Sequence, residues 1–375
     1  IEMANDDKPD MNKCTTSSSS GSTTTVENSS QEDGTSSSSS SLSSFGTART
    51  PWYGTTFVLL AEVMGTGILS LPYTAVTLGW TSTMIMLPTF AYLAYISSTF
   101  ISYVQQQYPH IKSYSDAATE FVNVQFGTFT NICMLLNWGS LAIYYLVAAS
   151  DAIGGLMGTD DGRFGCQINR TILAALLFLI PCQIRDFHGI SKVLSAPSFM
   201  AIVVAVFIVL ISTIVQQHEG NENTVFADET AGGPIVGTDG FSFISAIASI
   251  VFAYQGQSIF FELIAEMKDG SQFPKSTMVA YLIMFLAYGT TIVIAYGSQG
   301  VNTPGFLPDV LEQGSASAIA VNALTLFHLV VAYVIAVQPL HVWFHKTFRP
   351  STLYHNTWTG TRDCFIITFS FMVFG

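Results

Sequence analysis

Long stretches that are rich in apolar residues recur along this chain; they are longer than a strand and apolar on every side. Between Arg49 and Lys112 the only charged residue is Glu62. We divide this stretch into two spans, about 53–73 and 78–104, because a helix of about 20 apolar residues crosses the hydrocarbon core of a membrane. The other charge-free runs predict further spans at 121–150, 171–184, 193–218, 240–261, 276–308 and 313–345.

The run 171–184 is shorter than a membrane span needs, so its assignment depends on the charges around it. Lys and Arg are enriched on the cytoplasmic side of membrane proteins. If 171–184 counts as a span and the N-terminus lies inside, all but two of the 13 basic residues face the cytoplasm; Arg163 and Arg170 lie outside. The sequence therefore predicts eight spans and a cytoplasmic N-terminus.

The two ends of the chain differ from its middle. Residues 1–50 are rich in Ser and Thr and poor in apolar side chains, so we expect a disordered cytoplasmic tail, with regulatory phosphorylation as an alternative role. The last residues, "DCFIITFSFMVFG", read as the start of a truncated ninth span. We therefore expect a transmembrane domain over 51–375 whose C-terminal spans are missing from this sequence.

Composition supports a membrane protein and excludes several other classes. Hydrophobic residues make up 49% of the chain and charged residues 10%, whereas soluble domains contain about 25% charged residues. A net charge of -12 excludes a nucleic-acid binder with a basic face. The five cysteines are scattered, and there is no Walker loop or HExxH motif. We expect no metal, no cofactor, no enzymatic activity and no ATP-driven pumping.

Two of the predicted helices are interrupted halfway along their length. The first, "VLLAEVMGTGILSLPY" at 58–73, breaks at Gly65-Thr66-Gly67, and the sixth, at 244–267, breaks at Tyr254-Gln255-Gly256-Gln257. They are five spans apart and so cross the bilayer in opposite directions. This is the pattern of an inverted repeat whose broken helices form a site at the bilayer midplane. The alternative for Gly65 and Gly67 is close helix packing.

Four segments resemble motifs of one transporter family. "GTGILSLPYTAVTLGW" resembles the first-helix signature of the amino acid/auxin permease family, a transmembrane amino acid transporter family of the amino acid-polyamine-organocation superfamily. "FAYQGQSIFFELIAEMKDGSQFPKS" is similar to its sixth-helix motif, and "SYSDAATEFVNVQFG" and "PLHVWFH" resemble two further segments. The resemblance implies an all-α, LeuT-like fold with a five-plus-five inverted repeat, and secondary transport of amino acids by alternating access.

The same resemblance assigns a substrate site to the two breaks. Backbone N–H groups at the first break would bind the carboxylate of an amino acid, assisted by the helix dipole. Carbonyls and side chains at the second break would bind the amino group and the side chain. An aromatic residue of the third span would lie beside the pocket, with plain helix packing as its alternative. The expected residues are Gly65, Thr66, Gly67, Tyr145, Phe252, Ala253, Tyr254 and Gln255.

Two differences from the sodium-coupled branch of the family, together with one carboxyl group, predict the coupling ion. The sodium-coupled branch of the family carries Asn where this chain has Ala61, and hydroxyl residues where "VIAVQ" precedes Pro339. Both changes favour protons over sodium. Glu62 is the candidate proton carrier, because a carboxyl inside a span is costly when ionised; a vestibule position or a pair with Lys268 is the alternative. Glu262 is expected to gate the sixth helix or to form a structural ion pair.

Several alternatives stay open at the level of sequence. His328 and Asn322 are lone polar residues in the eighth span, expected to be satisfied by a neighbouring helix. The expected partners are an amino acid, a proton or sodium ion and the lipid bilayer, in the plasma membrane or the vacuolar membrane. The competing functions are sodium-coupled transport, an amino acid sensor that signals through the tail, and a channel.

Overall fold

The computed structural model describes residues 50–65, 67–157, 166–183, 193–220 and 240–348. Within these ranges the chain is helical and contains no β-strand; one isolated bridge joins Thr50 and Met267. The predicted tail up to Arg49 and the predicted start of the ninth span lie outside the described residues.

The first predicted span consists of a short helix and the start of a long one. α1 (Trp52–Val63) ends where Met64 leaves helical geometry, and α2 begins at Gly67 and continues to Gln107. Gly79 bends α2 sharply, with φ 76° and ψ 168°, a conformation that only glycine adopts without strain. The first and second predicted spans therefore meet at Gly79 inside one element.

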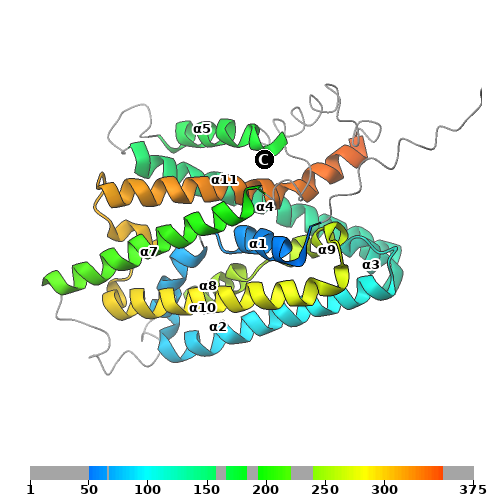
Figure 1. Ribbon diagram of the computed structural model, residues 1–375, viewed down its shortest axis with the longest axis horizontal. Helices are drawn as coiled ribbons and strands as arrows, with labels where there is room; N and C mark the ends of the chain where they lie inside the picture. Colours follow the sequence, from blue (N-terminus) through cyan, green and yellow to red (C-terminus); the bar gives the residue numbers. More distant parts are fainter. Residues whose placement is uncertain (1–49, 66, 158–165, 184–192, 221–239, 349–375) are drawn as a thin grey trace, which may run out of the picture. The chain divides into compact units, whose positions relative to one another are not determined.

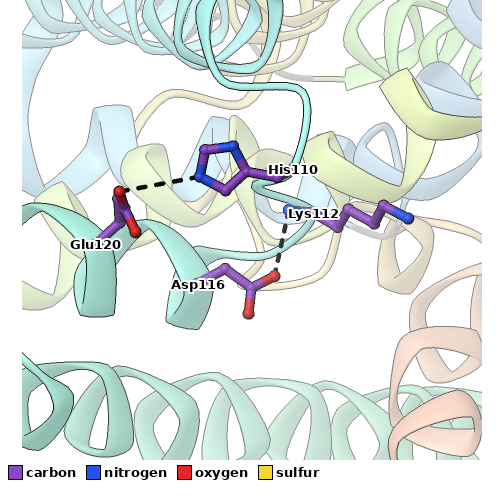
Figure 2. A network of polar contacts seen from close by, with 4 residues as sticks. All are labelled: His110, Lys112, Asp116 and Glu120. Atoms are coloured by element: carbon purple, nitrogen blue, oxygen red, sulfur yellow. Dashed lines mark hydrogen bonds and ion pairs between the residues drawn. The ribbon is translucent and has the colours of Figure 1, made fainter.

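A short helix, α3 (Tyr114–Phe121), follows α2 and buries no residue. Its N-cap, Ser113, accepts a hydrogen bond of 3.1 Å from the backbone N–H of Asp116. The Asp116 carboxylate accepts one of 3.2 Å from the Lys112 N–H, as Figure 2 shows. His110 Nε2 and Glu120 Oε1 are 4.0 Å apart and both exposed, so this pair contributes only about 0–1 kcal/mol. Local capping thus defines where α3 begins.

The next helices are α4 (Val124–Met157), α5 (Gln167–Leu179) with the short η1 (Pro181–Gln183), and α7 (Ser195–Gly220). α5 has 13 residues and ends before Pro181, whose missing N–H cannot continue the ladder. It is apolar but shorter than a full span, as the length of the run 171–184 indicates.

The second interrupted helix is divided into α8 (Gly240–Ala253), η4 (Gln257–Ile259) and α9 (Phe260–Glu266). After η5 (Gly270–Gln272), α10 runs over Phe273–Gln299. The connection to the last described helix contains η6 (Gly300–Asn302) and η7 (Leu307–Val310). That helix, α11 (Ala316–Phe348), includes Pro339.

Six helical segments of the described residues are long and apolar enough to cross a membrane, so the chain is an integral membrane protein. They account for the second, third and fifth to eighth predicted spans: Gly67–Gln107, Val124–Met157, Ser195–Gln216, Gly240–Glu266, Gly270–Asn302 and Ala316–Phe344. The count is lower than eight because α2 joins parts of two spans and because α1 and α5 are short.

The short helix α1 is largely buried by its neighbours. It packs against α7, α10 and α11, while α10 lies along α2, and α11 along α4 and α7 (Figure 1). Every residue from Val58 to Val63 is buried, whereas α2 carries exposed apolar side chains such as Ile85, Tyr92 and Phe100. The helices around α1 therefore hold its broken C-terminal end inside the protein.

Candidate functional site

The break after α1 leaves backbone groups without helical partners. The Met64 N–H still donates to the Leu60 carbonyl at 3.0 Å, and the Ile68 N–H to the Gly65 carbonyl at 3.3 Å. The last carbonyls of α1 and the first N–H groups of α2 are left outside the regular ladder, as at any helix end. Thr66 lies outside the described residues, so its expected contact with a substrate is not placed.

The second break lies between α8 and η4. The Tyr254 N–H donates to the Val251 carbonyl at 3.2 Å, and the Gln255 N–H to the Phe252 carbonyl at 3.0 Å, so the helix tightens before it stops. The Gly256 N–H then donates to the side-chain oxygen of Gln257 at 3.1 Å. The interruption occurs within the predicted residues, Tyr254 to Gln257.

The two broken helices lie side by side and run in opposite directions. Thr50, before α1, exchanges backbone hydrogen bonds of 2.9 Å with Glu266, the last residue of α9, and with Lys268; this short bridge is itself parallel, because the chain turns after α9. Further along, a methyl group placed on Gly256 would lie 2.8 Å from side-chain atoms of both Leu59 and Val63. One placed on Gly67 would lie 3.8 Å from Ala253. Each step forward along the first helix is thus a step backward along the second.

A small cavity lies between the two breaks. The centre of a water molecule can reach about 20 Å³ of it, which is room for roughly one water. Its lining comes from α1, the start of α2, α4 and the end of α8: Glu62, Val63, Gly65, Gly67, Leu141, Tyr144, Tyr145, Phe252, Ala253 and Gln255. An amino acid would fit only if these side chains moved apart.

Most residues expected at the site share this cavity. Gly65, Gly67, Tyr145, Phe252, Ala253 and Gln255 line it, and so does Glu62. Tyr254 does not line it, because its ring packs 5.3 Å from that of Tyr288 and 6.2 Å from that of Tyr281. Glu262 lies in α9 beyond the second break, where its carboxylate interacts electrostatically with Tyr114.

Tyrosine hydroxyl groups bind several of the carbonyls that the breaks set free. The hydroxyl of Tyr145, in α4, donates to the Glu62 carbonyl at 3.0 Å. That of Tyr288, in α10, donates to the Ala253 carbonyl at 2.9 Å and lies 3.5 Å from the Val63 carbonyl. A free carbonyl is costly in a membrane unless protein or water satisfies it. These tyrosines therefore stabilise both irregular segments.

Tyr114, in α3, makes the corresponding contact beyond the second break. Its hydroxyl donates to the Gln257 carbonyl, and its ring lies edge-on, 4.8 Å from that of Phe261. Tyr114 as a whole is half-buried, but desolvation of its hydroxyl, and then the Glu262 carboxylate, raise the pKa of Tyr114, so the hydroxyl keeps its proton and remains a donor. α3 is thereby linked to the broken helix.

Sequence reasoning missed several residues of this region. Tyr144 and Leu141 line the cavity, and Asn137 Oδ1 accepts a hydrogen bond of 2.6 Å from Gln255 Nε2. Tyr281 and Tyr288 are seven residues apart in an apolar helix, so they share one face, and that spacing is a signal for two polar groups aimed at one neighbour.

The Glu62 carboxyl is enclosed rather than placed in an open vestibule. Glu62 is 2% exposed, and its Oε2 has no hydrogen-bond partner among the described residues. Its carboxyl interacts electrostatically with Tyr145, Tyr281 and Tyr288. Within the described part of the chain no ion pair joins it to Lys268, whose side chain is exposed.

Comparison with known proteins tests the family that the motifs indicate. The family model described as "Transmembrane amino acid transporter protein" matches residues 48–374. Lysine histidine transporter-like 3 of Arabidopsis thaliana is 22% identical over 307 residues, which is 77% of this chain and 66% of that protein. The N amino acid transport system protein of Neurospora crassa is 25% identical over 274 residues, 69% of this chain and 55% of that protein.

Amino acid permease 6 of Arabidopsis thaliana is 22% identical over 321 residues, with 77% of this chain and 65% of that protein covered. The chain thus spans between about half and two thirds of the length of these relatives, which are named as transporters and permeases rather than as enzymes. The family expected from the motifs of the first and sixth helices is confirmed. The chain belongs to the transmembrane amino acid transporter family.

Proposed function

We propose that the protein is a secondary active transporter that moves amino acids across a membrane in step with protons. The observation that carries this proposal is the cavity between two broken, antiparallel helices, which both breaks line. Irregular backbone at membrane depth is tolerated where it is buried or lines a cavity, and transporters of the inverted-repeat class bind their substrates at such places. The named functions of the relatives point the same way.

The two charged ends of an amino acid match the two breaks. The N-terminal end of α2, at Gly67, offers N–H groups and the positive end of a helix dipole to a carboxylate. Gly65 and Gly67 lack side chains that would keep a ligand from the backbone. The carbonyls of the segment from Phe252 to Gln255 can accept from an ammonium group, because a carbonyl that already binds a tyrosine keeps a second lone pair.

The small volume of the cavity suits a stage of transport in which the site is narrowed. At the end of the bundle where α1 begins, Thr50 is paired with Glu266 and Lys268, and the Lys275 ammonium lies 4.1 Å from the centre of the Trp52 ring. Separation of these contacts would open a path toward that side, the cytoplasmic side if the N-terminus lies inside. An arrangement with a five-plus-five inverted repeat would then alternate access around one site.

Proton coupling is assigned to Glu62. Its carboxyl lines the cavity next to the first break, so its charge state alters the field that a bound amino acid meets. Ala61, where the sodium-coupled branch has Asn, is fully buried among apolar neighbours and offers no side-chain ligand to a cation. A neutral, protonated Glu62 favours the approach of a substrate carboxylate, and this links proton binding to substrate binding.

The test is uptake of labelled amino acids by the full-length protein in proteoliposomes. An inward proton gradient should drive accumulation without sodium, and Glu62→Gln should exchange amino acids across the membrane but no longer accumulate them against a gradient. Glu120→Gln, which changes an exposed carboxyl of α3, is the matched control and should behave as wild type. Uptake that follows sodium and ignores pH would contradict the coupling, and a protein that binds amino acids without moving them would contradict transport.

A further inference from the structure

His328 presents to the break of α1 a nitrogen atom that has no hydrogen-bond partner in the part of the chain that the structure describes. The residue lies in α11, is 0% exposed, and belongs to no contact that the proposed transport step uses. Its Nδ1 lies 3.0 Å from the hydroxyl and 3.2 Å from the backbone carbonyl of Ser198, in α7. A carbonyl can only accept, so the hydrogen bond to it requires the proton of the neutral ring on Nδ1. The Nε2 is then a lone-pair acceptor.

The Nε2 atom points toward Gly65. It is buried and has no hydrogen-bond partner among the described residues. A methyl group placed on Gly65 would lie 3.6 Å from this nitrogen and 3.9 Å from both the Glu62 carbonyl and the Tyr145 ring. A buried acceptor without a partner is rare in a native protein and calls for a ligand, a proton or a water.

Few ionisable groups surround this nitrogen. α1 contributes Glu62, since its other ionisable residue, Tyr53, is exposed. From α4 the nearest is Tyr145, whose hydroxyl already donates to the Glu62 carbonyl. The part of α7 from Ser195 to Gln216 has no Asp, Glu, Lys, Arg or His. Arg170, in α5, packs against Gly154 instead. Cys182 of η1 interacts with Tyr333, and His341 lies more than three turns further along α11.

We propose that His328 is a second proton-binding group of the transport site, which acts with Glu62 on the carboxylate end of the substrate. The inference rests on the proposed transport function. A proton from solution binds to the Nε2 lone pair and turns this nitrogen from an acceptor into a donor with positive charge. The imidazolium then stands beside the backbone of Gly65, where the substrate carboxylate is proposed to bind.

The two charge states differ in their effect on that carboxylate. A neutral His328 directs a lone pair at the break and disfavours an anionic oxygen, because two acceptors then face each other. A protonated His328 offers a charge-assisted hydrogen bond, which is about twice as strong as a neutral one. Proton and amino acid therefore bind better together than separately, and by linkage each strengthens the other to the same extent.

The experiment measures amino acid binding to the full-length protein in detergent between about pH 4 and 8, a range that also covers a buried imidazole, because desolvation disfavours its charged form. The probe is the proteinogenic amino acid that gives the wild type its largest thermal shift. The Kd should decrease as the pH falls. His328→Gln should reduce this pH dependence of the Kd by up to about tenfold per pH unit, which is the effect of one proton. Ligand-induced proton uptake, followed with a pH indicator, should drop by about one proton in this variant.

A second variant and a matched control complete the design. His328→Asn keeps an amide near the Ser198 contacts but has no group at the Nε2 position, and it should lose the same pH dependence. His110→Gln, an exposed histidine beside α3, should keep it. A His328 variant that binds with the wild-type pH dependence would overturn the inference while leaving transport intact. If no amino acid binds to or is transported by the wild type, it is the proposed function that fails.

Discussion

The hydroxyl group of Tyr288 donates a hydrogen bond of 2.9 Å to the backbone carbonyl of Ala253, the last residue of α8. The same hydroxyl lies 3.5 Å from the carbonyl of Val63, the last residue of α1. One side chain of α10 therefore contacts both broken ends. A hydroxyl has a single proton, so the shorter bond to Ala253 is the stronger of the two.

Tyr288→Phe should destabilise the protein by about 1–3 kcal/mol, because it leaves a buried carbonyl without its donor. The measurement is thermal unfolding in detergent. Tyr92→Phe is the control, since Tyr92 is exposed and the loss of its hydroxyl should change stability by less than about 0.5 kcal/mol. Equal melting temperatures for the two variants would show that Tyr288 does not hold the breaks.

Gly256→Ala should press the two broken helices apart. The added methyl group would lie 2.8 Å from Leu59 and Val63 and 3.3 Å from the Tyr281 hydroxyl, and such overpacking costs about 1–3 kcal/mol. We expect a lower melting temperature and weaker amino acid binding. Gly289→Ala is the matched control, because its methyl group would meet Leu87 at an ordinary 3.7 Å. Unchanged binding in Gly256→Ala would argue against close contact at this point.

Lys275→Gln should weaken closure at the end of the bundle where α1 begins. The ammonium of Lys275 lies 4.1 Å from the centre of the Trp52 ring, a contact that contributes about 0.5–1 kcal/mol at an exposed site. Amide hydrogen exchange at Thr50 and Lys268 should become faster, since their paired N–H groups open more often. Lys275→Arg keeps the cation and should exchange as slowly as wild type; equal rates in both variants would contradict this role.

Asp309, in η7, should make stability depend on pH. Asp309 is exposed, but desolvation by the atoms around it, and then the Asp151 carboxylate, raise its pKa, so its ionised form is less favourable in the folded protein than in the unfolded chain. This penalty is present at neutral pH and disappears as the pH falls below the pKa in the folded protein. Asp309→Asn should therefore melt at a higher temperature than wild type at neutral pH, and the difference should shrink on acidification.

The control for Asp309 is Glu312→Gln, which changes the net charge by the same amount in the same connection. A similar rise in melting temperature for both variants would assign the effect to overall charge. A difference between Asp309→Asn and wild type that grows on acidification would have the wrong sign and would contradict the assignment.

Local chemistry explains what could be predicted about the breaks. Gly65, Gly67 and Gly256 interrupt apolar runs, and glycine lowers helix propensity by about 1 kcal/mol relative to alanine. Helix propensity and the length of an apolar run are both properties of a short stretch of chain. The positions of the breaks and of the spans can therefore be predicted without knowing the tertiary structure. The placing of most expected residues around one cavity follows from these two breaks, because a membrane protein must bury irregular backbone.

By itself, then, the sequence determined the class of the protein, the positions of the broken helices and the motifs of its family. Only the tertiary structure decided that Tyr254 packs against Tyr288 instead of lining the cavity, and that the Nε2 atom of His328 faces Gly65. The physical reason is that a helix fixes which residues share a face, whereas its rotation against its neighbours depends on side-chain packing over distant segments. A hydroxyl or a ring nitrogen reaches a particular backbone atom only once that rotation is set.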